Sequence, residues 1–346
     1  MKSIKIIYPV ILLLIIVSCE KIVMHPNPEI DNLSIFDEYA KICTEKFGLE
    51  EVKGINLSEL ADSLRPMISD DLSKEELFEL MGMFVDRMQE GHTSLKEIDF
   101  SLNKSYYWFT GYPTAINKPI VDKYYFGEEA NPDVQVIAPD DSYYEIYYGL
   151  LPQDNQIGYI QMNSFMMTVT DAELDTMMAY LNDAKGIIID VRSNIGGFID
   201  LAARLSSYFT QNEVIIGTNF IKNGPGKNDF AASEMKIKPS GSSYAFYKPV
   251  VILHDRVTFS SGSIFCVMMN AMENTTSIGV RFGGGTGDIM DGILANGWHW
   301  VLSTSNLVDT QGRPTDPGIE ADIPMSINPA DTITDALIER AIIELK

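Results

Sequence analysis

Cysteine, histidine and basic residues are all scarce in this chain of 346 residues, and each scarcity narrows the classes of protein that it fits. The 3 cysteines include no CxxC pair and no Cys/His cluster, so no metal site is expected. The 26 Lys and Arg residues are outnumbered by 48 Asp and Glu residues, which gives a formal charge of −22. That charge repels phosphate backbones, so no nucleic-acid partner is expected.

Apolar residues, in contrast, are plentiful. The chain is 45% hydrophobic and 21% charged, and it contains no internal repeat. Such a composition can bury a core, which excludes a disordered, collagen-like or coiled-coil protein. At about 150 residues per domain, the length predicts about two structural units.

The N-terminus has the features of an export signal. Lys2 and Lys5 precede an apolar run, residues 6–17, that is too short for a comfortable membrane span. The run ends in Ile-Val-Ser-Cys, which resembles a bacterial lipobox with Cys19 as the lipid-modified residue. Residues 1–18 are therefore predicted to be a lipoprotein signal peptide, the alternatives being an ordinary signal peptide or an uncleaved anchor.

Residues 19–30 contain two prolines and are predicted to be a tether. The expected product is an exported bacterial lipoprotein, on the periplasmic face or in the outer membrane, held to the membrane by the lipid on Cys19. Cys43 and Cys266 would then remain, and their apolar surroundings predict buried free thiols.

Residues 31–95 are predicted to form a helical domain. A capping box, Ser73 to Glu76, opens a helix with an apolar stripe, and Gly91 is expected to be its C-cap. His92 would then lie just beyond a rigid helix end. Residues 96–150, rich in Tyr and Pro, are predicted to be a connecting region of short strands and loops.

Residues 151–346 show alternating strand and helix patterns, which predict an α/β core domain. The expected strands are 158–162, 186–191 and 249–254. One expected helix follows Thr170, and two more cover 198–209 and 261–272. Residues 332–345 form an amphipathic stretch. The strands at 186–191 and 249–254 are continuous apolar runs, as a sheet covered on both faces requires.

Two segments of this region carry chemistry. In the first, a buried strand leads into the polar turn 258–263 and then into an apolar helix, so a serine there would lie at a helix N-terminus that favours an oxyanion. A cluster of N-capping serines is the simpler interpretation. In the second, Gly196 and Gly197 follow a strand and open a helix, where their N–H groups can face an anion.

A serine nucleophile needs a base, and few are available. His25 lies beside the tether, His254 lies within an apolar strand, and His299 lies between two tryptophans. His92 follows a helix end, where its ring can be both oriented and accessible. Lys346 is the only lysine after Ser260, which excludes a downstream Ser–Lys pair.

Six short motifs occur in the order in which they occur in the tail-specific, or C-terminal-processing, serine peptidase family. Together they resemble that family, and most closely its tricorn-like branch. The motifs are Glu90-Gly91-His92-Thr93 (with Glu for the usual Asp), Gly158-Tyr159-Ile160, residues 190–197, 258–263, 276–287 and 317–322. The resemblance implies a crotonase/ClpP-like α/β core of stacked ββα units with a helical N-terminal domain. The stretch between His92 and Gly158 is too short for the family's PDZ module, so none is expected.

The resemblance also implies roles for individual residues. Ser260 would be the nucleophile and His92 its base. The oxyanion hole would use the N–H of Ser261 together with that of Gly197 or Gly196.

The sequence departs from the family at two positions. Gly285 stands where the Ser–Lys branch has its lysine, and Thr315 stands where the tricorn-like branch has an acid. Asp316, next to Thr315, is the candidate orienting acid.

The predicted function is a serine peptidase of the cell envelope that acts on peptides or proteins through an acyl-enzyme, without a cofactor. One alternative is a catalytically inactive peptide-binding lipoprotein with the same fold. Acyl-CoA chemistry, which the same core supports in other proteins, is a third possibility. It ranks below the other two because an exported protein has little access to CoA.

Overall fold

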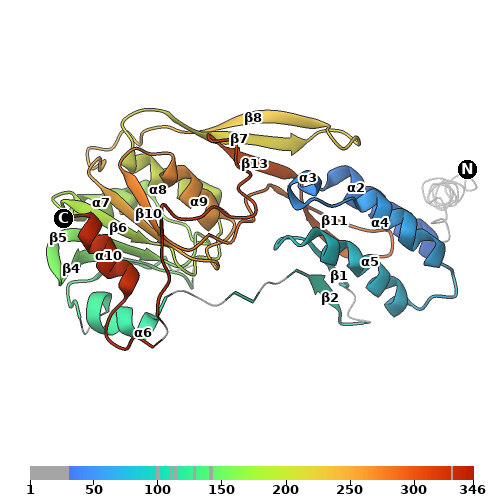
Figure 1. Ribbon diagram of the computed structural model, residues 1–346, viewed down its shortest axis with the longest axis horizontal. Coiled ribbons are helices and arrows are strands. Elements are labelled where there is room, and N and C mark those ends of the chain that lie inside the picture. The colour runs from blue at the N-terminus through green and yellow to red at the C-terminus, as the bar shows by residue number, and fades with distance from the viewer. Residues whose placement is uncertain are drawn as a thin grey trace, which may run out of the picture.

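The computed structural model describes residues 31–98, 102–108, 111–112, 116–127, 130–139, 143–328 and 330–346. They form a helical N-terminal part and a larger part built around a sheet, side by side (Figure 1). This arrangement confirms the predicted α/β class with a helical N-terminal region. Cys43 and Cys266 are buried and free, as predicted, whereas the signal peptide, Cys19 and the tether lie outside the described residues. No helix among the described residues has the length and apolar character needed to cross a membrane.

The N-terminal part packs helices against one face of an antiparallel sheet. Its helices are α2 (Asn32–Lys46), α3 (Glu50–Lys53), α4 (Leu57–Leu64), the 3-10 turn η1 (Arg65–Met67) and α5 (Lys74–Met88). Its sheet has the order β11 (Ile289–Ile293), β12 (His299–Ser303), β1 (Ser94–Lys96), β2 (Ser105–Tyr107). Because β11 and β12 come from the predicted core range, this sheet pairs strands from residues 94–107 with strands from residues 289–303.

The end of α5 differs from the prediction. The capping box at its start is present, with Ser73 and Glu76 bonded to each other's backbone N–H. Its C-cap is Gln89, in a left-handed conformation with φ 47°, and not Gly91. Gly91 serves another purpose, because a Cβ there would lie 2.6 Å from the ring of Phe259. Its lack of a side chain allows the helix end to approach the turn that contains Phe259.

A seven-stranded sheet forms the centre of the larger part. Its order is β14 (Ile323–Pro324), β10 (Thr275–Gly279), β9 (Val250–His254), β6 (Gly186–Asp190), β5 (Asp154–Met162), β4 (Ile146–Leu151), β3 (Gln135–Ile137). The strands from β14 to β5 are parallel, and β4 and β3 continue the sheet in antiparallel pairing. The sheet thus begins before residue 151, within the range predicted to be a connecting region.

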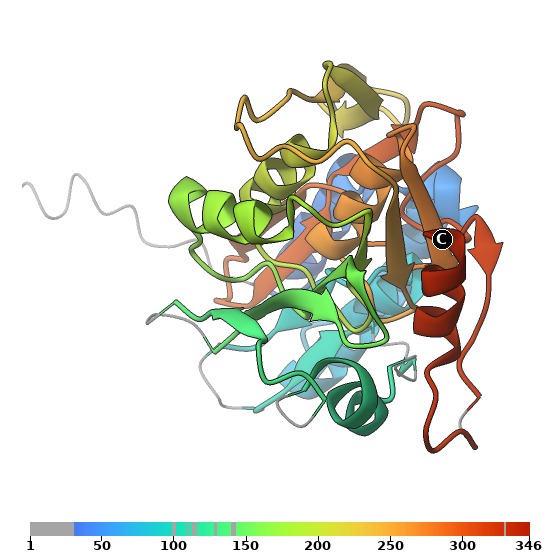
Figure 2. The same cartoon turned by 90° about the vertical axis from the view of Figure 1, so that its left-hand side faces the viewer.

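Helices cover both faces of this sheet. On one face lie α7 (Asp171–Leu181), α8 (Ile199–Ser206) with the 3-10 turn η3 (Ser207–Phe209), and α9 (Ser261–Asn270). On the other lie α6 (Lys118–Ile120), the π-helical turn η2 (Val121–Phe126) and α10 (Ala336–Glu344). Figure 2 shows α7 and α8 on the side of the strands opposite to α10.

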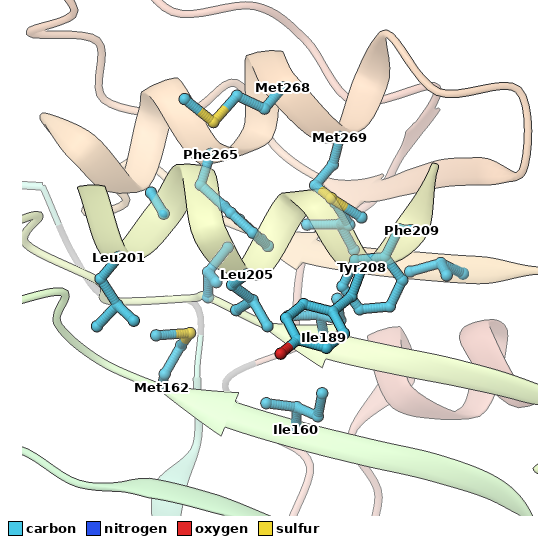
Figure 3. Close-up of a cluster of buried hydrophobic side chains, with 14 of the residues drawn as sticks. Ile160, Met162, Ile189, Leu201, Leu205, Tyr208, Phe209, Phe265, Met268 and Met269 are labelled. Carbon is cyan, nitrogen blue, oxygen red and sulfur yellow. The ribbon is translucent and has the colours of Figure 1, made fainter. Parts of the chain in front are cut away.

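Alternation along the central strands explains why both faces are apolar. In β9, Val250 and Ile252 face the core beneath α7 to α9, whereas Val251 and Leu253 face the core beneath α10. The first core brings strand residues such as Ile189 together with Leu205 of α8 and neighbouring helix residues (Figure 3). Each fully buried aliphatic side chain contributes about 1.5–3 kcal/mol relative to an exposed one.

A three-stranded sheet lies beside these two parts. Its order is β13 (Ser305–Asp309), β7 (Val214–Lys222), β8 (Phe230–Ile237), all antiparallel. In Figure 1 the β7–β8 hairpin reaches from the larger part toward the N-terminal helices.

The C-terminal helix is fixed to the sheet by a buried ion cluster. Arg192, two residues after the end of β6, lies 2.8 Å from Asp335 and 2.5 Å from Asp190, and all three side chains are fully buried. Asp335 also caps α10 by accepting the N–H groups of Leu337 and Ile338. The cluster holds the chain at the start of the 192–197 turn against α10.

We expect Asp335→Ala to lower the free energy of unfolding by about 3–5 kcal/mol, because it leaves a buried guanidinium without one of its partners and removes a helix cap. The exposed pair of Arg340 and Glu344 on the same helix is a matched control. Glu344→Ala should cost less than about 1 kcal/mol. Urea unfolding of the three proteins makes the comparison, and equal costs for both variants would contradict the importance of the cluster.

Candidate active site

Ser260 occupies a strained position between β9 and α9. It is the N-cap of α9 with φ 54° and ψ −128°, a conformation that costs a non-glycine residue about 1–3 kcal/mol. Two backbone hydrogen bonds hold it there. The N–H of Ser260 donates to the carbonyl of Gly284 over 2.9 Å, and the N–H of Phe259 donates to the backbone carbonyl of Asn194 over 2.8 Å. The Ser260 side chain makes no capping hydrogen bond to α9, whose first N–H groups have no intrahelical acceptor.

His92 brings a base to this hydroxyl from the other part of the molecule. Its Nε2 lies 3.1 Å from Ser260 Oγ, although the two residues are 168 positions apart. Its Nδ1 lies 3.0 Å from Glu90 Oε1, and its ring stacks on Phe259 at a centroid distance of 4.7 Å. If Nδ1 carries the proton and donates it to Glu90, the lone pair of Nε2 faces the Ser260 hydroxyl.

Glu90 is itself held firmly. Only 2% of its surface is exposed, and its Oε2 accepts the N–H groups of His92 and Thr93 and the hydroxyl of Thr93. Burial opposes its charge, but the hydrogen bonds and charge of His92 prevail and lower the pKa of Glu90 to about 2. For His92, burial favours the neutral ring, whereas the hydrogen bond and charge of Glu90 outweigh burial and raise its pKa. A carboxylate with a lowered pKa thus contacts the imidazole and stabilises its protonated form.

The turn of residues 192–197, called the glycine turn below, lies against Ser260. Gly196 and Gly197 have φ values of 94° and 137°, which favour glycine. A Cβ on Gly196 would lie 2.6 Å from the Cβ of Ser260, and one on Gly197 would lie 2.2 Å from the backbone nitrogen of Met166. Both positions therefore require glycine for close packing as well as for backbone conformation.

Two N–H groups remain for an oxyanion. The N–H of Gly196 donates to Asn194 Oδ1 over 2.9 Å and is already used. The N–H of Phe165 donates to the carbonyl of Gly196, and the carbonyl of Phe165 accepts the N–H of Phe198. In such a parallel pairing, the N–H of Gly197 points away from Phe165. Among the described residues, none accepts a hydrogen bond from the N–H of Gly197 or of Ser261. The geometry therefore favours Gly197 over Gly196 as the partner of Ser261.

Asp255 connects the glycine turn with the serine turn, which is the segment that leads from β9 to Ser260. The sequence patterns did not reveal this connection. Its Oδ1 accepts the N–H of Ser193 in the glycine turn and the N–H groups of Val257 and Thr258 in the serine turn. The Thr258 hydroxyl adds a bond to the carbonyl of Val191. A single carboxylate thus sets the position of both turns.

The acid on His92 is Glu90, whereas Asp316 was the sequence candidate. Asp316 makes no hydrogen bond with His92 among the described residues; its Oδ2 lies 2.8 Å from Lys53 Nζ. Burial and the charge of Glu90 raise the pKa of Asp316 against the opposing effect of Lys53. Thr315 is buried and bonded to Thr286. Glu90 is the residue that replaces the usual Asp in the motif Glu90-Gly91-His92-Thr93. Its position two residues before His92 is the signal that could have identified it from the sequence.

Gly285 shows why a lysine does not fit at that position. A Cβ there would lie 2.3 Å from the ring of Phe259 and 3.0 Å from His92 Cε1. The space for a side chain at 285 is filled by the base and the ring on which it stacks. His254, which the sequence places within an apolar strand, is fully buried; burial lowers its pKa to about 4, and Nδ1 lies 2.9 Å from the carbonyl of Val280. It does not reach Ser260.

A pocket of about 460 Å³ opens beside the His92–Ser260 pair. Its lining includes the immediate neighbours of the pair, Gly91 and Phe259, and Ile195 next to the glycine turn. The volume falls within the range of about 300–1,000 Å³ that holds small ligands in proteins.

Comparison with known proteins agrees with this geometry. Residues 156–325 match the family model described as peptidase family S41. The chain is 34% identical over 137 residues to the carboxy-terminal processing protease CtpA of Bacillus subtilis (strain 168); the match covers 39% of this chain and 27% of that protein. The chain therefore spans much less than two thirds of that relative's length.

Solved structures extend the likeness to the whole fold. A crystal structure of a candidate peptidase from Parabacteroides merdae ATCC 43184 is 28% identical with a TM-score of 0.80, covering 92% of this chain and 97% of that one. The photosystem II D1 C-terminal processing protease, 12% identical with a TM-score of 0.55 over 90% of this chain and 99% of its own, shares the fold. Residues 156–325 therefore form a peptidase family S41 domain.

Proposed function

We propose that the protein is a serine peptidase that cleaves peptide bonds through an acyl-enzyme. The observation that carries the proposal is the continuous chain of contacts from Glu90 through His92 to Ser260, at 3.0 and 3.1 Å, with Ser260 inside the peptidase-family domain. Both distances lie within the reach required for a base and its orienting group. Peptide or protein substrates follow from the family.

Each residue has a step in the reaction. The proton of Ser260 Oγ moves to His92 Nε2 while Oγ bonds to the carbonyl carbon, and the N–H groups of Gly197 and Ser261 bind the resulting oxyanion. The intermediate then collapses: the C–N bond breaks, His92 gives its proton to the leaving amine, and an ester on Ser260 remains. Water repeats the sequence on the ester, which releases the acid product and restores the hydroxyl.

Labelling with a fluorophosphonate probe tests the proposal directly. The wild-type protein should be labelled, Ser260→Ala should not be, and His92→Ala should lose at least about 99% of the labelling rate, because general-base assistance contributes about 10²–10⁴-fold. Asp291→Ala is a matched control, since Asp291 lies on β11, the edge strand of the N-terminal sheet, and contacts the half-buried His299. A folded wild-type protein that is not labelled would favour the alternative, a peptide-binding protein with an inactive site.

The rate should also depend on pH in a defined direction. His92 must be neutral to accept the proton, and Glu90 raises the pKa of His92 above its usual value near 6.5. We therefore expect kcat/KM to be low in acid and to rise with pH through an apparent pKa above 6.5. A pH–rate profile with a fluorogenic peptide measures this limb. An inflection below 6.5 would show that another group is titrating.

We further propose that the protein is an exported lipoprotein of the cell envelope, anchored through Cys19. The support is the sequence alone: two lysines, an apolar run and Ser18-Cys19. Labelled fatty acid should be incorporated into the wild-type protein in a bacterial host and not into Cys19→Ser. Incorporation into both proteins, or into neither, would contradict the anchor.

A further inference from the structure

Lys53 lies where the two parts of the molecule meet beside the catalytic pair. It is the last residue of α3, on the side of the N-terminal part that faces the larger part (Figure 1), and its side chain is only 18% exposed. Its ammonium donates to the backbone carbonyl of Gln89 over 3.0 Å and lies 2.8 Å from Asp316 Oδ2. One cation therefore holds a point on each part of the molecule.

The contact with Gln89 bears on the base. Gln89 ends α5 in a left-handed conformation, with φ 47°, which is unfavourable for a residue other than glycine. It directly precedes Glu90, whose carboxylate is bonded to both the backbone N–H and the ring of His92. The bond from Lys53 therefore holds the point at which the segment that carries the base leaves α5.

The contact with Asp316 bears on the nucleophile. The backbone carbonyl of Asp316 lies against Gly284, where an added Cβ would lie 1.6 Å from that oxygen. The carbonyl of Gly284 in turn accepts the N–H of Ser260 over 2.9 Å, and Phe259 forms a β-bridge with the same glycine. Asp316 is thus two backbone contacts away from the nucleophile.

The helix that carries Lys53 is itself anchored. Ahead of α3, the N–H of Gly48 donates to the carbonyl of Ser303 over 2.9 Å. Within α3, Glu50 Oε1 accepts the N–H of Leu57, at the start of α4, over 2.7 Å. These bonds fix both the strand side and the helix side of the segment, so the ammonium of Lys53 projects from a supported backbone.

We propose that Lys53 is a positioning residue of the peptidase, which sets the distance between His92 and Ser260 by bonding to Gln89 and Asp316. Its ammonium has no hydrogen bond to either catalytic residue among the described residues, so it acts through their placement. Misplacement of a reacting group by about 1 Å costs about 10²-fold in rate. The inference rests on the proposed peptidase function, and it adds a residue from outside the family-matched range 156–325.

Lys53→Met tests the inference in the full chain, because it removes the ammonium and nearly keeps the length of the side chain. The rate of fluorophosphonate labelling and kcat for a fluorogenic peptide should both fall by about 10²-fold, with KM within about threefold of the wild-type value. Lys74→Met is a matched control, since Lys74 lies 3.0 Å from the fully buried Glu97 and both residues belong to the N-terminal part. It should leave both rates within about twofold of the wild-type values.

The outcomes separate this inference from the peptidase function. A lower melting temperature for Lys53→Met with wild-type rates would show a merely stabilising role and overturn the inference alone. A raised KM with unchanged kcat would also overturn it, because Lys53 would then act on substrate binding. A wild-type protein that is neither labelled nor able to cleave peptides would overturn the peptidase function and this inference with it.

A second variant decides the question if Lys53→Met does not fold. Lys53→Gln keeps a hydrogen-bond donor but loses the charge and part of the reach of the side chain. Its labelling rate should be at least about tenfold below that of the wild-type protein, because a shorter side chain cannot contact Gln89 and Asp316 at once. A wild-type rate for this variant would overturn the inference.

Discussion

Glu90→Gln is expected to lower kcat by about 10⁴-fold while leaving KM nearly unchanged. An amide at this position offers its N–H₂ group to His92 Nδ1, which stabilises the tautomer with the proton on Nε2. That tautomer cannot accept the proton of Ser260. The contact of Glu90 with Nδ1 at 3.0 Å makes this the side chain that selects the tautomer. Steady-state kinetics with a fluorogenic peptide measures the change.

Asp316→Asn is the informative comparison, because Asp316 was the acid that sequence resemblance favoured. It makes no bond to His92, so its replacement should lower kcat far less than Glu90→Gln does. Circular dichroism would establish that both variants are folded. An activity loss for Asp316→Asn that equals the loss for Glu90→Gln would return the orienting role to Asp316.

Gly196→Ala is expected to lower kcat by about 10³-fold. The added Cβ would lie 2.6 Å from the Cβ of Ser260 and 3.1 Å from the N–H nitrogen of Ser261, in a backbone conformation with φ 94° that alanine avoids. The serine and one oxyanion donor must both shift. Loss of one such donor costs about 10²–10³-fold, and misplacement of a reacting group by about 1 Å costs about 10²-fold.

Gly297→Ala separates backbone strain from this contact. Gly297 has φ 88°, close to that of Gly196, but an added Cβ would meet nothing within 4 Å. The two variants should lose similar stability through strain, and only Gly196→Ala should lose activity beyond it. Melting temperatures and kcat measured on the same preparations make the comparison. Equal kcat values would show that the contact with Ser260 does not matter.

Much of the fold could be predicted because its signals are local. The apolar runs at 186–191 and 249–254 became β6 and β9, the capping boxes at Ser73 and Thr170 open α5 and α7, and the apolar helix after Ser260 became α9. Strand periodicity and helix caps depend on neighbours a few residues away, which the sequence displays directly.

The remainder depends on contacts between distant segments. The pairing of β1 with β12 joins residues about two hundred positions apart, and no periodicity encodes such a partner. Family resemblance predicted Ser260 as nucleophile and His92 as base, and their side chains lie 3.1 Å apart in the structure. Resemblance placed the candidate orienting acid near Thr315, at Asp316, whereas the carboxylate that contacts His92 in the structure is Glu90, held by two backbone N–H groups.

The glycine at 285 limits how the chemistry of this site can change through substitution. Its absent side chain leaves the space that His92 and Phe259 fill, so the histidine base and a lysine at 285 compete for one volume. Gly285→Lys would displace His92 before the new ammonium group could act as a base. Replacement of His92 alone would leave an empty space at 285 and no base beside Ser260. The two catalytic solutions are therefore separated by an inactive intermediate, and passage between them requires coordinated change at 92, 259 and 285.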